Sequence, residues 1–505
     1  MPDPTAQQPV IDFLGRPDTH GGKSVRRIDT HAATVFLAGN RALKIKRAVR
    51  FPFLDYSTLA KRKSACEAEI EVNRPFAPAI YRGVVAITRA AGGTLAIGGD
   101  GEPVEYAVEM NRFDENRTLD KLAEAGGLDE ALADMTARAV ASAHAIAPPV
   151  RDAGFADTIF EIVGQNHDEL RAAADLFAAD QVDALTAASR QALERLRPLL
   201  DARTREACVR RCHGDLHLGN IVMVEDRPVL FDAIEFDPKL ATIDVFYDLA
   251  FLLMDLIARG LTPLANIVLN RYLNESGRDG DLDALSLLPL FMSLRAAIRA
   301  KVTAARPDRN ETIDNSARAY FALARKLIAP PPPMLVAVGG LSGTGKSLLA
   351  RALSGAVAPL PGAVLLRSDV TRKTMFGKGE TEPLPAEAYT AAVTARVYAA
   401  LAAKAARVIA AGHSAIVDAV FAQAQERDAV AQAAHGAPFH GLFLAADLAT
   451  RVARVGARTG DASDADATVA RAQERYDLGT LAWHRIDASG TPEQTLQRSK
   501  AALGL

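Results

Sequence analysis

The segment Val338–Ser347 reads VGGLSGTGKS and contains the pattern GxxxxGK[ST] from Gly340 to Ser347. It follows the apolar run MLVAVGG and opens a helical pattern, which is the setting that a phosphate-binding loop needs. Glycines let backbone N–H groups converge on phosphate oxygens, and the helix N-terminus adds positive potential. We therefore expect Lys346 to reach the β- and γ-phosphates of ATP and Ser347 to ligate Mg²⁺. The remaining nucleotide contacts are predicted for Gly340, Ser342, Gly343, Thr344 and Gly345.

Predicted strands and helices alternate along residues 334–505. Five short apolar stretches are predicted to be strands: MLVAVGG, AVLLRSD, SAIVDAV, FHGLFLAAD and WHRIDA. Helical stretches fill the gaps between them. Such alternation is typical of a parallel, doubly wound sheet with helices on both faces. The sequence thus predicts an α/β P-loop NTPase fold for residues 334–505.

Two carboxylates lie where predicted strands end. Asp369 follows the second strand and Asp418 ends the third. Because the carboxyl ends of parallel strands face the ligand crevice, Asp369 is predicted to accept the proton of an attacking hydroxyl, with Arg372 one turn later holding the substrate. Asp418 is predicted to hold the magnesium ion and its water shell. An N-cap role is the alternative for Asp369, and the two roles are compatible.

Arginines at helical spacing precede the polar stretch DASDAD. They are Arg451, Arg454 and Arg458. Arginines brought over phosphates stabilise the transferring charge, so the pattern predicts a closing lid in which Arg454 and Arg458 are catalytic. A solvated helix face is the alternative for any one of them.

Together, GLSGTGKS, SDVTRK and RTGDASDAD resemble the P-loop kinases of small molecules and 5′-hydroxyl groups. Gluconate kinases, polynucleotide 5′-kinases and zeta-toxin-like kinases share this layout, and the resemblance covers residues about 334 to 505. In polynucleotide kinases an aspartate and an arginine with DxxR spacing act as base and substrate clamp. By that resemblance these roles fall on Asp369 and Arg372.

A second candidate site lies in HGDLHLGNIV, residues 213–222, and in the following VLFDAIEFD. Phosphoryl transfer from ATP needs a base near the acceptor hydroxyl and oxygen ligands for Mg²⁺. Asp215 offers the base, and Asn220 and Asp232 offer the ligands. An HxxxH zinc site in the same segment is the alternative, which this Asp and Asn set disfavours.

A nucleotide-binding lysine is expected on a strand upstream of that segment. RALKIKR supplies Lys44 and Lys46, which alternate onto the same strand face, and we assign Lys44 with Lys46 as the alternative. Its partner is expected in the helical segment CEAEIEV, where we choose Glu69 over Glu67 and Glu71. For any single glutamate, a plain surface charge on the helix is the alternative.

HGDLHLGN followed by FDAIEFD resembles the aminoglycoside phosphotransferase family, related to choline and fructosamine kinases. The resemblance covers residues about 24 to 325 and implies a bilobal α+β protein-kinase-like fold. It also implies Asp215 as catalytic base, Asn220 and Asp232 as magnesium ligands and Lys44 as a ligand of the ATP phosphates. Both domains in one chain resemble bacterial proteins described as fused aminoglycoside phosphotransferase and ATP-binding proteins.

Two further features bear on catalysis at the N-terminal site. Asp248 in FYDLA matches the structural aspartate of the aminoglycoside phosphotransferases. The glycine-rich GxGxxG loop is missing before Lys44, where the chain reads THAATVFLAGN. Two alternatives to a pair of working sites therefore stay open. The N-terminal half can be a binding or sensing module without catalysis, or it can control a toxin-like kinase in the C-terminal half.

The prolines of Ala329–Pro333, APPPP, predict a stiff boundary, because a helical pattern ends before them and an apolar strand begins after them. Upstream, a small β-rich lobe precedes a mainly helical one. The predicted parts are an N-terminal extension (1–23), a kinase-like domain (24–328), a proline linker (329–333) and a P-loop domain (334–505).

Composition narrows the class of protein. The chain has 505 residues, of which 49% are hydrophobic and 24% charged, as in ordinary globular proteins. Its formal net charge of -2 gives no reason to expect nucleic-acid or membrane binding, except for a nucleic acid as a 5′-hydroxyl substrate. Sparse cysteines and the lack of a signal-peptide pattern predict a cytoplasmic protein. Zinc binding by Cys208, Cys212 and His213 is disfavoured by their spacing.

The substrates are predicted to be small molecules with hydroxyl groups. An aminoglycoside is a polycation and needs an acidic wall. The segment SLRAAIRAKVTAARPDR instead places Arg295 and Arg299 on one helix face. We therefore expect the N-terminal domain to take an anionic or neutral substrate.

Overall fold

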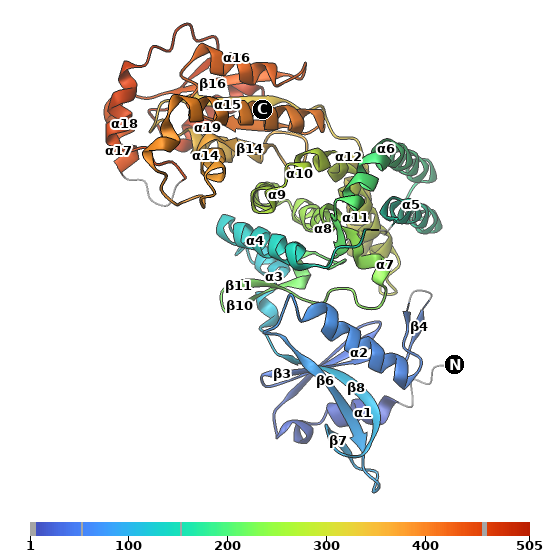
Figure 1. Cartoon of the computed structure of the whole chain (residues 1–505). Helices are drawn as coiled ribbons and strands as arrows, with labels where there is room; N and C mark the ends of the chain where they lie inside the picture. The colour runs from blue at the N-terminus through green and yellow to red at the C-terminus, as the bar shows by residue number, and fades with distance from the viewer. Residues whose placement is uncertain (1–6, 52–53, 152–153, 457–461) are drawn as a thin grey trace. The chain divides into compact units, whose positions relative to one another are not determined.

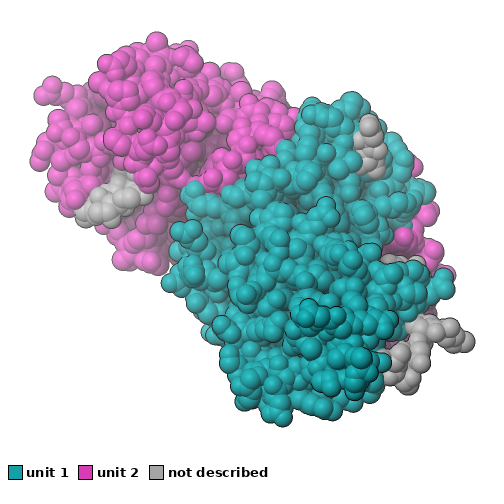
Figure 2. Space-filling view, turned by 60° about the horizontal axis from the view of Figure 1, so that its bottom comes forward, with its two compact units in different colours: residues 1–162, 197–255 teal, residues 163–196, 256–505 magenta. Residues whose placement is uncertain are grey.

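The computed structural model describes residues 7–51, 54–151, 154–456 and 462–505. The chain forms two compact units (Figure 2): unit 1 comprises residues 1–162 and 197–255, and unit 2 comprises residues 163–196 and 256–505. The proline segment 329–333 lies within unit 2, so the helices before it and the sheet after it belong to one compact unit.

Unit 1 begins with a six-stranded antiparallel sheet in the order β1-β2-β3-β8-β6-β7 (Figure 1). Side chains alternate between its faces. Leu43 and Ile45 of β3 enter the core beneath helix α1, and Ala42 enters the core beneath helix α2. By the same alternation Lys44 and Lys46 lie on the α2 face, as predicted. The elements are α1 (Gln8–Leu14), β1 (Val25–Asp29), β2 (Ala33–Ala38), β3 (Arg41–Lys46), β4 (Arg50–Phe51), β5 (Leu54–Asp55), α2 (Leu59–Asn73), β6 (Tyr81–Arg89), β7 (Leu95–Ile97) and β8 (Glu102–Asn111).

Helices and two short antiparallel pairs, β9 with β12 and β10 with β11, make up the rest of unit 1. Strand β9 ends just before the segment 213–220, and β10 begins directly after it. The elements, some of which continue into unit 2, are α3 (Leu119–Glu124), α4 (Glu130–Ile146), α5 (Phe155–Ala172), α6 (Ala179–Arg205), β9 (Val209–Arg211), β10 (Ile221–Val224), β11 (Arg227–Leu230), α7 (Pro238–Ala241), β12 (Thr242–Asp244) and α8 (Val245–Ala258).

Unit 2 contains a five-stranded parallel sheet in the order β14-β15-β13-β16-β17. Every residue of its central strand β13 is buried, which explains why that segment is apolar throughout. All five predicted strands are present, and the prediction of a parallel P-loop fold is confirmed. The strands are β13 (Leu335–Gly340), β14 (Val364–Arg367), β15 (Ala415–Asp418), β16 (Phe439–Ala445) and β17 (His484–Asp487).

Unit 2 also contains helices from both sides of the proline segment. Besides the parts of α5, α6 and α8 that fall in unit 2, the helices before the prolines are α9 (Thr262–Ser276), α10 (Gly280–Asp283), α11 (Leu288–Ala304) and α12 (Glu311–Ile328). The later ones are α13 (Lys346–Ser354), α14 (Ser368–Met375), α15 (Ala391–Ala410), α16 (Ala424–Gln432), α17 (Leu448–Gly456), α18 (Ala467–Ala472) and α19 (Pro492–Leu503). Among the described residues, no helix combines the length and apolarity needed to cross a membrane.

Candidate active sites

The first candidate site, in unit 1, is organised around two lysines of β3. Lys44 Nζ lies 3.0 Å from Glu69 Oε1 and 2.7 Å from Asp232 Oδ1. Lys46 Nζ lies 2.5 Å from Glu69 Oε2 and also pairs with Glu235. Glu69 is fully buried and serves both lysines. The structure therefore brings together the predicted residues Lys44, Glu69 and Asp232.

Charge pairing dominates the electrostatics of this cluster. Burial alone would lower the pKa of Lys44, but Asp232 and Glu69 outweigh it and raise that pKa well above its usual value. The positive charge of Lys44 in turn lowers the pKa of Asp232. Lysine and carboxylates are thus all ionised at neutral pH, which is the state needed to bind phosphate and a metal ion.

The segment 213–220 presents the candidate base and one candidate metal ligand. Asn220 Nδ2 donates to Asp215 Oδ2 at 3.0 Å and to the Asp215 carbonyl at 2.9 Å. The Asp215 side chain is 42% exposed, so an acceptor hydroxyl can reach it. Asp232, across the β10–β11 hairpin, has φ 61, a conformation that non-glycine residues adopt at a cost. Oxygen atoms of Asn220 and Asp232 are hard donors suited to Mg²⁺.

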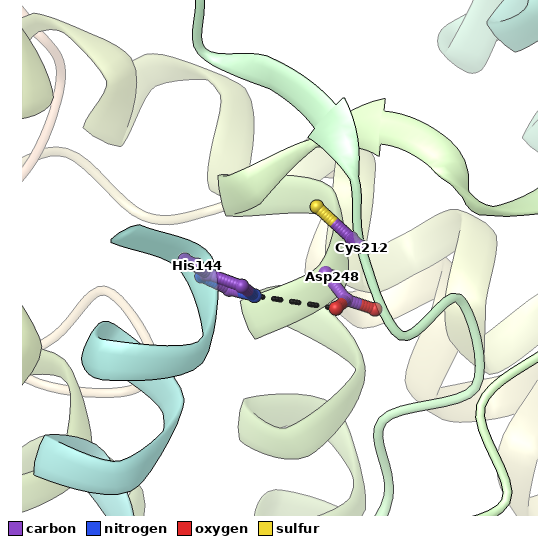
Figure 3. A group of neighbouring side chains, drawn as sticks. All are labelled: His144, Cys212 and Asp248. Atoms are coloured by element: carbon purple, nitrogen blue, oxygen red, sulfur yellow. Dashed lines mark hydrogen bonds and ion pairs between the residues drawn. The ribbon is translucent and has the colours of Figure 1, made fainter. Parts of the chain in front are cut away.

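A buried aspartate of α8 holds this segment in place. Asp248 accepts hydrogen bonds from the backbone N–H groups of His213 at 3.1 Å and Gly214 at 3.0 Å. Figure 3 shows His144 of α4 pointing at the same carboxylate, with Nε2 at 3.2 Å from Oδ2. The aspartate is fully buried, so these bonds replace the water it has lost.

The second candidate site, in unit 2, is the loop between β13 and α13. Its backbone is clamped at Ser342, whose N–H donates to Gln473 Oε1 at 2.6 Å and whose carbonyl accepts from Arg451 Nε at 2.9 Å. Gly343 has φ 86, and a Cβ there would lie 2.4 Å from the Arg451 carbonyl oxygen. Only glycine fits this position, because both the conformation and the close approach exclude a side chain.

Two strand-end residues of the sheet meet the phosphate loop. Ser347 Oγ donates to Asp418 Oδ2 at 2.6 Å, and Arg367 Nε lies 3.3 Å from the same oxygen. A hydroxyl and a carboxylate in contact at the start of α13 form an oxygen donor pair that fits Mg²⁺. Lys346 Nζ donates to the Leu341 carbonyl at 3.3 Å, so it folds back over the loop.

Asp369 lies in the first turn of α14, whose N-cap is Arg367. The N-cap alternative for Asp369 is therefore wrong, although a carboxylate in the first turn still favours the helix dipole. Burial, followed by the negative charge of Asp418, raises its pKa, while Lys346 and Arg367 act in the opposite direction. A raised pKa makes the carboxylate a stronger base, as proton abstraction from a hydroxyl requires.

Two family models match the chain: the phosphotransferase enzyme family over residues 65–288 and an AAA domain over residues 335–478. Over 486 residues the chain is 31% identical to uncharacterized proteins of Mycobacterium tuberculosis and Mycobacterium bovis, with 93% of this chain and 93% of each relative covered. The chain belongs to this family of fused phosphotransferase–AAA proteins. The predicted pairing of an aminoglycoside phosphotransferase-like half with an ATP-binding half is confirmed, and the chain is an ATP-dependent kinase.

Two solved structures are similar to parts of the chain. A choline/ethanolamine kinase family protein from Mesorhizobium loti covers 65% of this chain and 96% of its own, at 14% identity and a TM-score of 0.40. A gluconokinase from Sinorhizobium meliloti covers 34% of this chain and 92% of its own, at 20% identity and a TM-score of 0.26.

The predicted arginines of the C-terminal half are placed differently from the expectation. Arg454 donates to the Ala488 carbonyl at 2.8 Å and the Gly490 carbonyl at 2.9 Å, so it braces the turn after β17. Arg372 is buried and donates to the Ala388 carbonyl at 2.5 Å, with its guanidinium 5.1 Å from the Tyr389 ring. Their predicted contacts with phosphate and substrate would require these bonds to break. Arg458 lies outside the described residues.

Residues to which the sequence assigned a different role, or none, complete both sites. Arg451, predicted only as part of a lid, is the buried arginine that holds the phosphate loop. Arg367 contacts the Asp418 carboxylate, and Glu235 pairs with Lys46 and accepts from Tyr56 Oη at 3.0 Å. A charged residue at the end of an apolar strand was the available signal for Arg367.

Cys66, Cys208 and Cys212, all within the described residues, are buried, as expected for small apolar side chains, and are not in disulfides. Cys212 nevertheless lies with His144 and Asp248 in a group whose candidate ligand atoms are all within 4.8 Å of one another (Figure 3). Each already has a bond within the chain: the Cys212 thiol donates to the Ile243 carbonyl at 3.5 Å, and Asp248 holds the backbone of 213–214. This group therefore fits a structural clamp.

Replacing Asp248 by asparagine is expected to lower the free energy of unfolding by about 3 kcal/mol, because an amide cannot accept from both backbone N–H groups and loses the charge. Urea denaturation followed by circular dichroism measures the change. The control is Asp226→Asn, which alters a side chain that is 90% exposed and should change stability by less than about 0.5 kcal/mol. Equal effects of the two substitutions would contradict the clamp role.

The two arginines proposed for the N-terminal substrate both lie in α11. Arg295 is buried in α11, and the Arg299 guanidinium lies 5.5 Å from the centre of the Tyr320 ring of α12. Their role in substrate binding stays a prediction.

Proposed function

We propose that the protein carries two working kinase sites, each of which transfers the γ-phosphate of Mg²⁺-bound ATP to a hydroxyl group. The acceptor of the N-terminal site is a small molecule, and that of the C-terminal site is a small molecule or a 5′-hydroxyl end. One observation carries the proposal: within each unit a lysine, oxygen donors for a metal and a candidate base come together. These sets are Lys44, Asn220, Asp232 and Asp215 in unit 1, and Lys346, Ser347, Asp418 and Asp369 in unit 2.

The paired lysine of the N-terminal site favours catalysis over a binding module. Lys44 bridges Glu69 and Asp232, which brings the cation next to the carboxylate proposed to bind the metal. A module that only senses ATP needs no exposed base, yet Asp215 is 42% exposed and oriented by Asn220. The missing glycine-rich loop weakens the hold on the phosphates, and the second lysine, Lys46, supplies additional positive charge to this cluster.

Hard oxygen donors support magnesium as the metal at both sites. The donors are a carboxylate and an amide oxygen at the N-terminal site, and a carboxylate and a hydroxyl at the C-terminal site. Mg²⁺ prefers such oxygens and keeps several waters besides. When bound, the ion would neutralise charge on the transferring phosphate. Sparse cysteines and a net charge of -2 support a cytoplasmic protein that acts on small molecules.

The test is a substrate panel with two disabled variants. Purified protein is incubated with Mg²⁺ and ATP against sugars, sugar acids, nucleosides, 5′-hydroxyl oligonucleotides and aminoglycosides, and products are detected by mass spectrometry. We expect two products, one lost in Asp215→Ala and the other in Lys346→Ala. The control is Asp226→Asn, which should retain both.

Product lost only in Lys346→Ala would reduce the N-terminal half to a binding or regulatory module. Product that survives both substitutions would overturn the proposal. Phosphorylation of kanamycin-type compounds at low concentration would contradict the expectation of an anionic or neutral acceptor.

A further inference from the structure

Helix α9 is built into the C-terminal sheet of unit 2. Strand β14 is the edge of that sheet, and its exposed backbone groups need partners. Asn270 Oδ1 accepts from the Leu365 N–H at 2.7 Å, and Asn266 Nδ2 donates to the Ala363 carbonyl at 3.0 Å. A Cβ at Gly362 would lie only 2.7 Å from Asn266 Nδ2. The helix thus completes the edge of the sheet.

A chain of alternating charges runs from α9 to the phosphate loop. Arg271 Nη1 lies 2.8 Å from Glu380 Oε2, and Glu380 Oε1 lies 3.4 Å from Arg367 Nη1. Arg367 Nε lies 3.3 Å from Asp418 Oδ2, the oxygen that accepts from Ser347 Oγ at 2.6 Å. All four charged residues of this series of ion pairs are mostly buried, with side chains between 4% and 24% exposed.

Glu380 determines how strongly Arg367 competes with a metal ion for the Asp418 carboxylate. Arg367 is shared between Glu380 and Asp418, so each carboxylate weakens its hold on the other. Arg271 fixes Glu380 in reach of Arg367, and Glu275 at 3.7 Å steadies Arg271 on the helix. Without Arg271, Glu380 is no longer anchored, and Arg367 turns fully to Asp418. A carboxylate neutralised by an arginine binds a divalent cation less tightly.

We propose that Arg271 and Glu380 are positioning residues for Asp418, through which helix α9 sets the affinity of the C-terminal site for Mg²⁺ and nucleotide. This inference rests on the proposed function of that site. In the chain, α9 follows α8, whose Asp248 and Asp255 accept hydrogen bonds from the backbone of 213–218. Consecutive helices therefore support the two kinase sites.

The test measures binding of a fluorescent ATP analogue to the full chain as Mg²⁺ is titrated, in a Lys44→Met background that disables the N-terminal site. Arg271→Met is expected to raise the Mg²⁺ midpoint about threefold or more, and Arg271→Lys is expected to restore most of it. The matched control is Arg407→Met. This substitution removes the ion pair between Arg407 and Asp283, at 2.8 Å, which joins a residue before the prolines to one after them but is not linked to Asp418. It should leave the Mg²⁺ midpoint unchanged.

An unchanged midpoint in Arg271→Met, or an equal shift in Arg407→Met, would overturn the positioning role alone. Nucleotide binding that persists in Lys346→Ala would overturn the proposed function of the C-terminal site as well. Thermal unfolding of each variant, recorded without nucleotide, shows whether a shift reflects a general loss of stability.

Discussion

Asp215→Asn is expected to lower kcat of the N-terminal phosphotransfer by about 10²- to 10⁴-fold, the usual contribution of a general base. An amide has the shape of the carboxylate but cannot take the proton of the acceptor hydroxyl. The side chain is 42% exposed, so its replacement should leave the fold and the KM for ATP nearly unchanged. Steady-state kinetics in a Lys346→Ala background, in which the C-terminal site is disabled, measure the loss.

The control for this prediction is Asp226→Asn, an aspartate of the same unit whose side chain is 90% exposed. It should keep full activity. A kcat for Asp215→Asn within a few-fold of the control would contradict the assignment of Asp215 as base. A rise in KM for ATP without loss of kcat would instead indicate a role in nucleotide binding.

Local backbone chemistry made the phosphate loop predictable. The glycine pattern, the strand before it and the helix after it are all adjacent in sequence, and the loop formed as expected between β13 and α13. The same holds for Lys44 and Lys46, because alternation along a strand fixes their common face. Alternation could not separate the two lysines, since both reach Glu69 and the partner of Lys46, Glu235, is 189 residues away.

The role of each arginine could not be read from spacing. Arg451 and Arg454 are three residues apart on α17, yet one holds Ser342 of the phosphate loop and the other braces the turn after β17. Tertiary packing decides which face of a helix contacts a loop more than a hundred residues away. Helical periodicity alone does not identify that face. The sequence therefore predicted an arginine-bearing helix near the site, and the catalytic roles of Arg454 and Arg458 stay predictions.

The prolines gave the clearest sequence signal for a domain boundary, but side-chain hydrogen bonds join the segments on either side of them into one compact unit. Asn266 and Asn270 come before the prolines and bind the edge strand that comes after them. Polar residues inside a helical pattern carry no local sign of a distant partner. For this reason the kinase-like domain predicted for 24–328 shares its last helices with the compact unit of the P-loop sheet.

Asp369→Asn is expected to lower kcat of the C-terminal phosphotransfer by about 10²- to 10⁴-fold and, at neutral pH, to stabilise the fold. Burial and Asp418 raise the pKa of Asp369, so the folded state disfavours its charge. Its contribution to stability is fully present below the pKa of the unfolded chain and is lost as the pH rises through the higher folded pKa. Asparagine has no charge to disfavour, so the gain should appear above the folded pKa and vanish in acid.

The control for the predicted combination of lower kcat and higher stability is Asp487→Asn. The backbone N–H of Ser489 lowers the pKa of Asp487, so its charge is favoured by the fold and its loss should destabilise the protein at neutral pH without affecting kcat. Thermal unfolding and kcat are measured across pH. The wild-type acid limb of kcat should lie above the usual pKa of an aspartate and disappear in Asp369→Asn. A carboxylate whose charge the fold disfavours is expected to be kept for its chemistry. A destabilised Asp369→Asn with normal kcat would therefore contradict the role of Asp369 as base and indicate a structural role in the first turn of α14.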